Sequence, residues 1–284
     1  MAWRATVNGS PRPVTTLPRR DTGASGTFGE ALQTCYPSTV SMRVLIIVPA
    51  FNEARNLPGV LRTLREACPD CDVCVVDDGS RDETGAIAAR TGATVLRHPV
   101  NLGIGGAVQV GYLWAREHGY DAAVQIDGDG QHDASYITSV LQPIVDSRAD
   151  LVIGSRFLAE RGFRSTVMRR IGIRYLAWFL RLRCGASVTD PTSGFRAASR
   201  RAIDLFASWY PSDYPEPEAI AYTTRNGLAI AEVPVVMRER EHGRSSIDLW
   251  RTLYYLVKVS LALVLLPTRR DLLALPPLPE ERAR

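Results

Sequence analysis

Lysine is nearly absent from this sequence: Lys258 is the single lysine, and every other basic residue among the 34 is an arginine. Guanidinium groups pair well with planar, bidentate partners such as phosphate, although the base composition of the gene would give the same bias. The formal net charge is only +4, and the arginines lie on apolar helical segments rather than among stacking aromatic side chains. This pattern excludes nucleic acid as a partner and favours phosphate-bearing ligands.

Cysteine is also scarce, with five residues in the chain, too few for a disulfide scaffold. Cys68, Cys71 and Cys74 are spaced like ligands of a metal cluster, but no fourth ligand is nearby. Because Cys74 falls within the strand pattern of residues 73–76, we predict that it is a buried thiol. The low cysteine content predicts a reducing, cytoplasmic compartment.

No uninterrupted apolar run is long enough to cross a bilayer, which takes about 20 residues. Residues 249–266 are strongly apolar, but Arg251 and Lys258 interrupt them. We therefore predict a helix that lies in the membrane interface, with packing on its own domain or on a membrane partner as the alternative. Residues 1–41 are polar and lack the apolar core of a secretory signal, so we predict a disordered N-terminal extension.

Residues 42–248 contain enough apolar residues for one large domain with a single core. Short apolar strand patterns alternate with helix patterns, at residues 44–48, 73–76, 94–96, 122–126 and 151–154. This alternation predicts an α/β fold with a doubly wound, mostly parallel sheet. Residues 249–284 follow as a membrane-associated amphipathic helix and a tail.

The segment from Asp127 to Asp133, Asp-Gly-Asp-Gly-Gln-His-Asp, directly follows the strand pattern of residues 122–126. Two carboxylates two residues apart can reach one hard cation if the backbone turns, and Gly128 and Gly130 permit that turn. Mg²⁺ and Mn²⁺ take oxygen ligands and leave room for substrate phosphates. A plain surface turn is the alternative, but open α/β sheets bind ligands at the carboxyl ends of their strands. We therefore predict a metal site here.

Residues 166–183 place apolar side chains and arginines at helical spacing, which predicts a basic amphipathic helix. Such a helix suits a membrane surface. A core helix with a solvated basic face explains the same pattern, and the sequence leaves both interpretations open.

Several motifs occur in a fixed order along the chain. They are Val-Pro-Ala-Phe-Asn-Glu at 48–53, Val-Val-Asp-Asp-Gly-Ser-Arg-Asp at 75–82, Asn101-x-Gly103-x-Gly105, the aspartate segment at 127–132, Asp-Pro-Thr-Ser-Gly-Phe-Arg at 190–196 and Arg-Glu-His-Gly-Arg-Ser-Ser at 240–246. With these motifs the chain resembles family 2 glycosyltransferases of the GT-A fold. Within that family it is most similar to polyprenyl-phosphate glycosyltransferases of the dolichyl-phosphate mannose synthase type. The resemblance covers about residues 43–248, and the motifs are specific only as an ordered set.

The resemblance implies roles for individual residues. A metal, Mg²⁺ or Mn²⁺, would be held by Asp127, Asp129 and Gln131. The implied catalytic residues are Asp127, Asp129, Asp190 and Arg244. The implied nucleotide-binding residues are Pro49, Ala50, Asn52, Glu53, Asp77, Gly105, Asp127, Arg240, Arg244 and Ser245, of which the last three belong to a loop that closes over the diphosphate. The implied acceptor-binding residues are Arg156, Arg169, Arg170 and Ser193.

Three residues in or near these motifs have a simpler interpretation. Asp82 suits a helix N-cap better than a ligand contact. His132 suits neutral support of the metal ligands better than metal binding. For Arg156, a surface ion pair of little energetic value is the alternative to a phosphate contact.

The activity that the resemblance implies is metal-dependent and inverting. A hexose would move from a nucleotide-diphosphate sugar, a UDP- or GDP-sugar, to a polyprenyl phosphate at the cytoplasmic face of the cell membrane. The protein would be attached there peripherally or monotopically, with a small membrane protein and a second copy of the chain as further candidate partners.

One segment departs from the subgroup, because Ser212 to Glu218 is more polar than the resemblance predicts. Glu216 and Glu218 are candidates for binding sugar hydroxyls or for acting as a general base. Solvated carboxylates in a first helical turn are the alternative. A second function therefore stays open, a family 2 enzyme that adds a sugar to a hydroxyl of a lipid-linked glycan in cell-wall or surface-polysaccharide synthesis. A non-catalytic nucleotide-sugar-binding scaffold is the third.

Overall fold

The computed structural model of the protein describes residues 42–158, 167–237 and 249–265. The predicted extension at 1–41 and the predicted closing loop with Arg240, Arg244 and Ser245 lie outside the described residues. The tail after residue 265 lies outside them as well.

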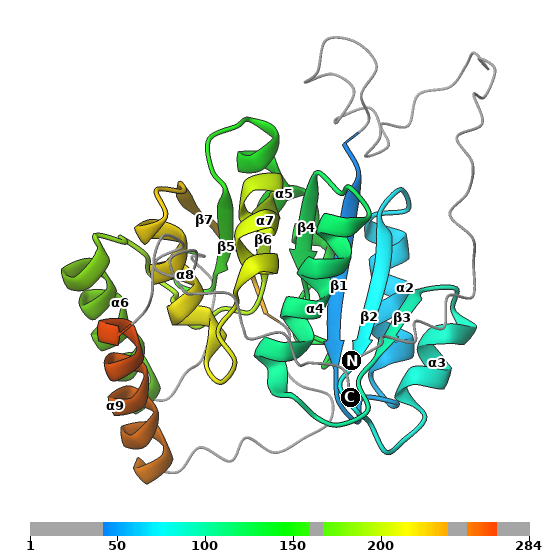
Figure 1. Cartoon of the computed structure of the whole chain (residues 1–284), viewed down its shortest axis with the longest axis horizontal. Helices are drawn as coiled ribbons and strands as arrows, with labels where there is room; N and C mark the ends of the chain where they lie inside the picture. Colours follow the sequence, from blue (N-terminus) through cyan, green and yellow to red (C-terminus); the bar gives the residue numbers. More distant parts are fainter. Residues whose placement is uncertain (1–41, 159–166, 238–248, 266–284) are drawn as a thin grey trace, which may run out of the picture.

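The described strands form one sheet in the order β3-β2-β1-β4-β6-β5-β7 (Figure 1). The strands are β1 (Val44–Ala50), β2 (Asp72–Asp77), β3 (Thr94–Arg97), β4 (Ala122–Gln125), β5 (Leu151–Ser155), β6 (Arg196–Ser199) and β7 (Ile230–Pro234). β6 runs antiparallel to its neighbours β4 and β5, and the other neighbouring pairs are parallel. The predicted mostly parallel sheet is confirmed.

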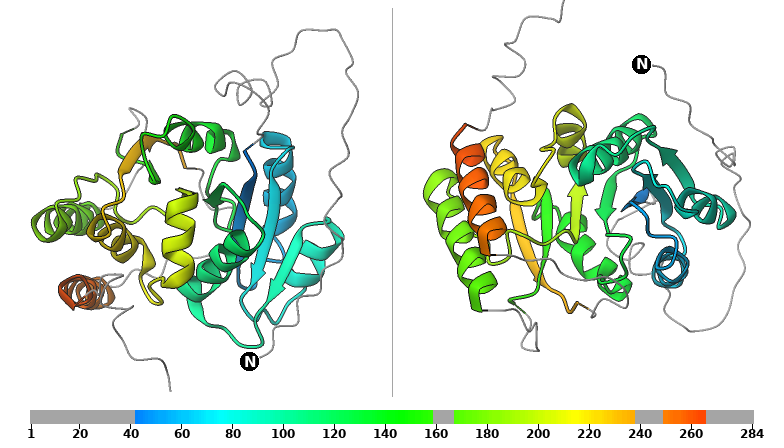
Figure 2. Two further views of the ribbon diagram at one scale, coloured as in Figure 1. Left: turned by 45° about the horizontal axis from the view of Figure 1, so that its top comes forward. Right: turned by 90° about the horizontal axis from the view of Figure 1, so that it is seen from below.

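Helices cover both faces of this sheet, as Figure 2 shows from two further directions. On one face lie α2 (Leu57–Ala67), α3 (Thr84–Arg90) and α5 (Ile137–Val145), which follows the short 3₁₀ turn η1 (Ala134–Tyr136). On the other face lie α4 (Gly103–Glu117), α6 (Val167–Cys184), α7 (Arg200–Ser208), α8 (Pro215–Arg225) and α9 (Leu249–Leu265). The sheet is thus the middle of three layers, with a hydrophobic core on each side.

The central strands explain why the sheet is covered on both faces. All seven residues of β1 are buried, as expected for a continuous apolar run with helices on both sides. On one side, α4 packs closely at Gly111, where an added Cβ atom would lie 2.3 Å from Cγ2 of Ile47. This close contact holds α4 against the centre of the sheet, and its first turn lies at the carboxyl end of the strands.

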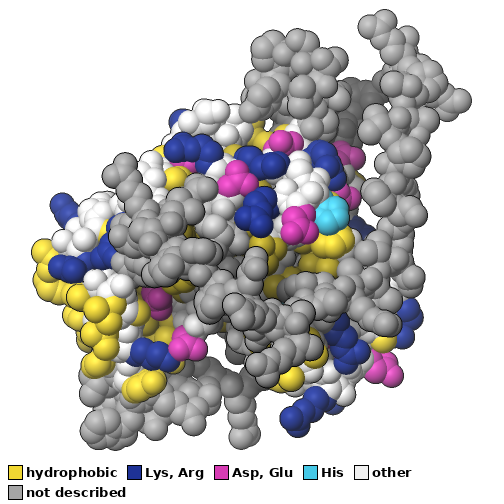
Figure 3. All heavy atoms as spheres, in the orientation of Figure 1, with side chains coloured by type: hydrophobic (Ala, Val, Ile, Leu, Met, Phe, Trp, Pro, Cys, Tyr) yellow, Lys and Arg dark blue, Asp and Glu magenta, His cyan; other side chains and the backbone are white. Residues whose placement is uncertain are grey.

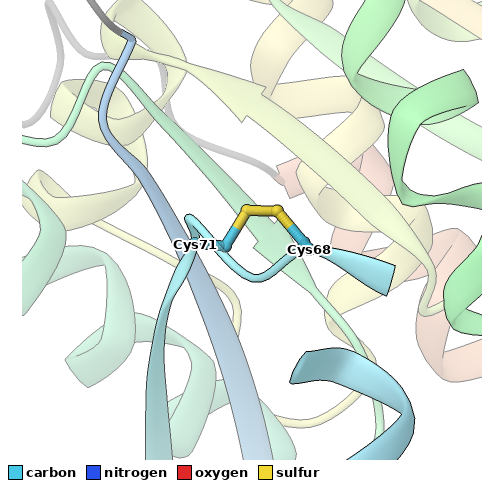
Figure 4. The surroundings of a disulfide bond; sticks show 2 residues. All are labelled: Cys68 and Cys71. Carbon is cyan, nitrogen blue, oxygen red and sulfur yellow. A yellow bond between two sulfur atoms is a disulfide. The ribbon is translucent and has the colours of Figure 1, made fainter. Parts of the chain in front are cut away.

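Cys74 is a free thiol, whereas Cys68 and Cys71 are bonded to each other. Cys74 is fully buried in β2, and this burial raises the pKa of its thiol to about 12, so the predicted buried thiol is confirmed. Cys68 and Cys71 are joined by a disulfide between the end of α2 and the start of β2 (Figure 4). The expectation of reduced thiols is therefore wrong for this pair. The Cys-x-x-Cys spacing is also compatible with metal binding, so the sequence alone did not reveal the disulfide.

α9 packs against its own domain with one face, since Val259 and Leu263 are fully buried. Lys258 forms an ion pair with Asp213, and Nη2 of Arg225 donates to the carbonyl oxygen of Leu263 at 2.8 Å. Within the described part of the chain, no helix has the length and apolar content needed to cross a membrane.

Candidate functional site

A pocket with a volume of about 300 Å³ lies at the carboxyl ends of β1, β2 and β4. The segments that follow these strands and the first turns of α4 form its walls. Its lining residues are Pro49, Ala50, Phe51, Glu53, Asp78, Asn101, Gly103, Ile104, Ala107, Asp127, Gly128 and Asp129. The pocket therefore forms at the sheet edge where an α/β fold is expected to bind its ligand.

The aspartate segment turns sharply at the floor of this pocket. Gly128 packs on β1, where an added Cβ atom would lie 3.2 Å from the carbonyl oxygen of Pro49. Gly130 has a φ of 77°, a left-handed conformation that suits glycine. Oδ1 of Asp129 accepts a hydrogen bond from the backbone N–H of Gln131 at 3.0 Å. The two glycines therefore make the turn that places Asp127 and Asp129 together in the pocket wall.

His132 is a buried residue that contacts Asp127. The backbone N–H of Asp127 donates to Nδ1 of His132 at 3.2 Å, which leaves the proton of the neutral ring on Nε2. This Nε2 lies 3.7 Å from Oδ2 of Asp127. The ring is buried and stacks on Phe195 at a centroid distance of 5.3 Å. His132 thus has the geometry of a residue that orients Asp127, as the sequence predicted for a supporting histidine.

The residues of this segment fit a hard divalent cation. Asp127 and Asp129 bring carboxylate oxygens to one pocket wall, and the Asp127 side chain is 34% exposed. Gln131, in the same turn, has a further oxygen donor in its side chain. Oxygen donors of this kind suit Mg²⁺ and Mn²⁺. Among the described residues, no cluster of three or more His, Cys, Asp or Glu side chains is arranged to hold a metal ion.

Asp78 organises the opposite wall of the pocket. Its Oδ1 accepts from the backbone N–H of Leu102 at 2.8 Å and lies 2.6 Å from Nδ1 of the buried His98. Its Oδ2 accepts from the N–H of Gly103 at 2.9 Å. The carboxylate therefore ties the end of β2 to the start of α4, whose first residues line the pocket. Asp78 lies in the motif at residues 75–82, but it was not among the predicted site residues.

The predicted nucleotide-binding residues divide into two groups. Pro49, Ala50, Glu53 and Asp127 line the pocket, whereas Asn52, Asp77 and Gly105 do not. Asp77 is fully buried beside α3, and its Oδ1 accepts from the N–H of Ser80 at 2.9 Å. At this position Asp78, not Asp77, forms the pocket wall, because neighbouring residues at the end of a strand point to opposite faces.

The other two residues shape the pocket without lining it. Asn52 has a φ of 56°, and its Oδ1 accepts from the N–H of Arg81 at 2.9 Å. Gly105 packs against the segment before α8, where an added Cβ atom would lie 2.0 Å from the carbonyl oxygen of Pro211. Asp82 accepts from the N–H of Thr84, the first residue of α3, at 3.0 Å, but the N-cap residue of this helix is Glu83, so the predicted N-cap at Asp82 is wrong by one residue.

Arg156 and Asp190 form a buried pair between the end of β5 and the segment that leads into β6. Nε and Nη2 of Arg156 donate to the two carboxylate oxygens of Asp190, both at 2.7 Å, and Nη2 also donates to Oγ1 of Thr192 at 2.7 Å. Arg156 is 5% exposed and Asp190 is fully buried. The alternative of a surface ion pair for Arg156 is therefore wrong, because the ion pair that it forms is buried. The same contacts leave most of the guanidinium engaged within the protein.

A second buried arginine shapes the segment that leads into β6. Nε of Arg196 donates to the carbonyl oxygen of Ser193 at 2.7 Å, and Nη2 donates to that of Pro191 at 3.3 Å. Ser193 itself is fully buried, and its neighbour Gly194 packs against the Asp127 carboxylate. Arg196 therefore holds this segment against the floor of the pocket.

Glu216 on α8 is the further carboxyl group near this floor. Burial raises its pKa, the Arg196 charge opposes that rise, and the Asp127 charge adds to it. Burial and the neighbouring Asp213 raise the pKa of Glu218, two residues on, to about 7. The alternative of two fully solvated carboxylates is therefore wrong.

Among the remaining predicted residues, the structure describes the side chain of Arg170, which does not line the pocket. Arg170 is exposed on α6. The side chain of Arg169 lies outside the described residues, as do Arg240, Arg244 and Ser245. Their roles stay predictions.

Comparison with known proteins adds four similarities. Residues 45–206 match the profile of a family described as glycosyl transferase family 2. The undecaprenyl-phosphate mannosyltransferase of Micrococcus luteus is 37% identical over 219 residues, 73% of this chain and 88% of that protein. The polyprenol monophosphomannose synthase of Mycolicibacterium smegmatis is 34% identical over 224 residues, 75% of this chain and 84% of that protein.

A solved structure gives the fourth similarity. The glucosyl-3-phosphoglycerate synthase of Mycobacterium tuberculosis, crystallised with Mn²⁺ and uridine-diphosphate-glucose, matches with a TM-score of 0.64 and 24% identity. The match covers 87% of this chain and 86% of that chain. This likeness confirms the expected fold class.

Proposed function

This chain belongs to glycosyl transferase family 2 and is a glycosyltransferase, and from that premise we propose that it transfers a hexose from a nucleotide-diphosphate sugar to a polyprenyl phosphate. The observation that carries the donor half is the pocket wall in which Asp127 and Asp129 stand opposite Asp78 and the start of α4. The acceptor half rests on the two relatives, whose names state polyprenyl substrates. Both names also state mannose, so a mannose nucleotide is the first donor to test.

The donor would lie with its diphosphate at Asp127 and Asp129. A divalent cation bound by these carboxylates and Gln131 would neutralise the charge of the leaving diphosphate. Asp78 holds the first turn of α4 in place, and His132 holds Asp127, so the wall that meets the donor is formed before the donor binds. Preformed walls of this kind lower the cost of ordering the site on binding.

The acceptor determines whether a base is needed. A polyprenyl phosphate is already an anionic nucleophile, whereas a sugar hydroxyl must lose a proton to a general base. Asp190 is fully buried and bound at both oxygens by Arg156, which leaves it no free oxygen edge toward a substrate. A phosphate acceptor, attacking the anomeric carbon in line with the leaving diphosphate and inverting the sugar, therefore agrees best with this geometry. Because this acceptor is a lipid, the reaction would take place at a membrane surface.

Glu216 favours a second candidate, transfer to a hydroxyl of a lipid-linked glycan. Its carboxyl group lies near Asp127, and its raised pKa would suit a general base better than an ordinary carboxylate. If a hydroxyl is the acceptor, Glu216→Gln abolishes transfer. If the phosphate is the acceptor and Glu216 does not touch the sugar, this variant keeps its rate.

The test uses the purified chain, a panel of radiolabelled nucleotide sugars, Mg²⁺ or Mn²⁺, and undecaprenyl phosphate in detergent. Asp129→Asn is the inactive control, and Asp133→Asn, at an N-cap position that asparagine also suits, is its matched partner. A chloroform-extractable, acid-labile sugar made by the wild type and by Asp133→Asn, but not by Asp129→Asn, supports the proposal. Sugar transfer to a glycolipid hydroxyl alone would overturn it in favour of the second candidate. Donor binding without any metal-dependent turnover on either acceptor would also overturn it.

A further inference from the structure

Residues 211–214, between α7 and α8, contact both the wall of the pocket and the helix α9, and we name them the 211–214 segment. α9 lies beyond residues 45–206, the part of the chain that matches the family profile. Figure 1 places α9 beside α8, and Figure 3 shows acidic and basic side chains among hydrophobic ones in the same part of the molecule. Contacts between α9 and the site are therefore a feature that the family profile does not describe.

On the pocket side, the carbonyl oxygen of Ser212 closes the first turn of α4. It accepts from the backbone N–H of Gly105 at 3.2 Å, and this N–H is one of those that a helix leaves without an internal partner at its start. An added Cβ atom at Gly105 would lie 2.4 Å from the same oxygen, so the contact depends on a glycine. The position of the 211–214 segment therefore sets the position of three residues of α4 that line the pocket, Gly103, Ile104 and Ala107.

On the other side, two residues of α9 hold the same segment. Nζ of Lys258 donates to Oδ2 of Asp213 in an ion pair. The ring of Tyr255 meets the ring of Tyr214 edge to face, with a centroid distance of 4.6 Å and an interplanar angle of 76°. Nζ of Lys258 also lies over the Tyr214 ring, 5.5 Å from its centroid. The 211–214 segment is therefore in direct contact with α4 through its backbone and with α9 through its side chains.

The aromatic contact is the stronger of the two contacts with α9. The side chains of Lys258 and Asp213 are 39% and 60% exposed, and ion pairs of this kind contribute little. Tyr214 and Tyr255 are both partly buried, and edge-to-face rings stabilise a contact beyond the area that they bury. Burial also raises the pKa of the Tyr255 hydroxyl, and the charge of Glu216 adds to the rise, which agrees with a position near the floor of the pocket. Tyr255 is therefore the residue through which α9 holds the segment.

We propose that Tyr255 is a positioning residue for the donor, because it holds the 211–214 segment against the first turn of α4 and thereby keeps the pocket wall in its binding position. α9 suits this role since Val259 and Leu263 anchor it in the core. A wall that is in place before the donor arrives lowers the cost of ordering the site. The inference rests on the proposed function in one respect, that the pocket binds a nucleotide. Without Tyr255, donor binding weakens, whereas acceptor binding and the turnover rate of the bound complex do not change.

The test is titration calorimetry of the full chain with UDP and with GDP, in the presence of Mn²⁺. We expect Tyr255→Ala to raise the Kd for the nucleotide that the wild type binds by about 3- to 10-fold. Tyr255→Phe keeps the ring and should restore the wild-type Kd. Tyr254→Ala, which removes a 60% exposed ring from the neighbouring position of α9, is the matched control and should bind like the wild type.

A second control separates positioning from a general loss of stability. Val259→Ala leaves a cavity under α9, because Val259 is fully buried. This variant should melt at a lower temperature than the wild type and keep its Kd. Steady-state kinetics give the complementary measurement, since Tyr255→Ala should raise the KM for the nucleotide sugar and leave kcat and the KM for the acceptor unchanged. Tyr214→Ala and Tyr255→Ala remove the same contact, so their effects on the Kd should not add in the double variant.

The outcomes distinguish this inference from the proposed function. If Tyr255→Ala binds the nucleotide as tightly as the wild type does, the positioning role is overturned, whether or not the protein transfers sugar. An equal loss of affinity in Val259→Ala overturns it as well, because the loss would then reflect the stability of α9. If the wild type binds a nucleotide that Tyr255→Ala binds weakly, but transfers no sugar to either acceptor, the positioning role stands and the proposed function fails. A wild type that binds neither UDP nor GDP overturns both.

Discussion

Arg156 and Asp190 form a bidentate ion pair in which both side chains are buried and both hydrogen bonds measure 2.7 Å. The pair joins the end of β5 to the segment that leads into β6, 34 residues further along the chain. Because a guanidinium never loses its charge at ordinary pH, the stability of this region depends on the carboxylate.

Asp190→Asn should therefore destabilise the protein strongly. The substitution leaves Arg156 buried without its counter-charge, which costs about 3–5 kcal/mol of the free energy of unfolding. Urea denaturation measures the loss. Asp146→Asn is the matched control, because Asp146 also pairs with an arginine at 2.7 Å, but on the surface. Its unfolding midpoint should hardly move, and equal effects of the two substitutions would contradict the role assigned to the buried pair.

Gly105→Ala should disturb the pocket through the backbone. An added methyl group would meet the carbonyl oxygens of Pro211 and Ser212 at 2.0 and 2.4 Å, neither of which can move without shifting the chain. We expect a loss of about 1–3 kcal/mol in the free energy of unfolding. Affinity for a nucleoside diphosphate should also fall, measured by titration calorimetry.

Gly59→Ala is the matched control for this substitution. Gly59 lies within α2, and an added methyl group there has no neighbour within 4 Å. Alanine in a helix interior is more stable than glycine by about 0.5–1 kcal/mol. A lower melting temperature for Gly59→Ala, or an unchanged melting temperature for Gly105→Ala, would show that the packing is not as described.

Glu218 should make stability depend on pH. Burial and Asp213 raise the pKa of its carboxyl group to about 7, above the value of 4.5 for the free side chain. The folded state therefore binds the proton more tightly than the unfolded state, and stability falls as the pH rises from about 4.5 through 7. Because the side chain is partly exposed, solvent screening keeps this effect below about 1 kcal/mol.

Glu218→Gln removes this pH dependence. The variant should melt about 1–3 °C above the wild type at pH 8, and the difference should shrink toward pH 4.5. The exposed Glu66→Gln, on the last turn of α2, is the control and should follow the wild type at every pH. A constant difference across the pH range would contradict the assignment.

Reduction of the Cys68–Cys71 disulfide should cost stability without loss of activity. Even a short closed loop restricts the unfolded chain, by about 2 kcal/mol on the chain-entropy account. The bond lies before the first residue of β2, at the opposite end of this strand from Asp78, so the pocket should be unaffected. Thermal unfolding with and without reductant measures the effect. Cys68→Ala/Cys71→Ala should lose the reductant sensitivity that Cys184→Ser keeps.

Local sequence patterns predicted the strands and turns around the pocket well. The apolar run of β1 and the turn at Gly130 each follow from a few neighbouring residues. β6 could not be predicted in this way, because its sequence Arg-Ala-Ala-Ser has neither strand propensity nor alternation. Its place in the sheet depends on partners in β4 and β5, which are distant in the chain.

The candidate site shows the same limit. Asp127 and Asp129 could be predicted because the motif and its position after a strand suffice. The choice between Asp77 and Asp78 could not, because it depends on which face of β2 each carboxylate takes. Arg156 pairs with Asp190 rather than with a substrate. This contact joins residues 34 positions apart, so no local sequence pattern predicts it.

The reversed direction of β6 has a consequence for how such a protein can diversify. Arg196, the first residue of β6, pairs with Gln125, the last residue of β4, so the segment from Asp190 to Phe195 arrives at the edge from which the other segments depart. The residues that line the pocket thus all lie before residue 134, and the segment that packs against the Asp127 carboxylate lies after residue 150. An insertion ahead of β6 would change the segment that supports Asp127 and leave the register of β1, β2 and β4 untouched. The sequence that supports Asp127 can therefore vary independently of the residues that line the pocket.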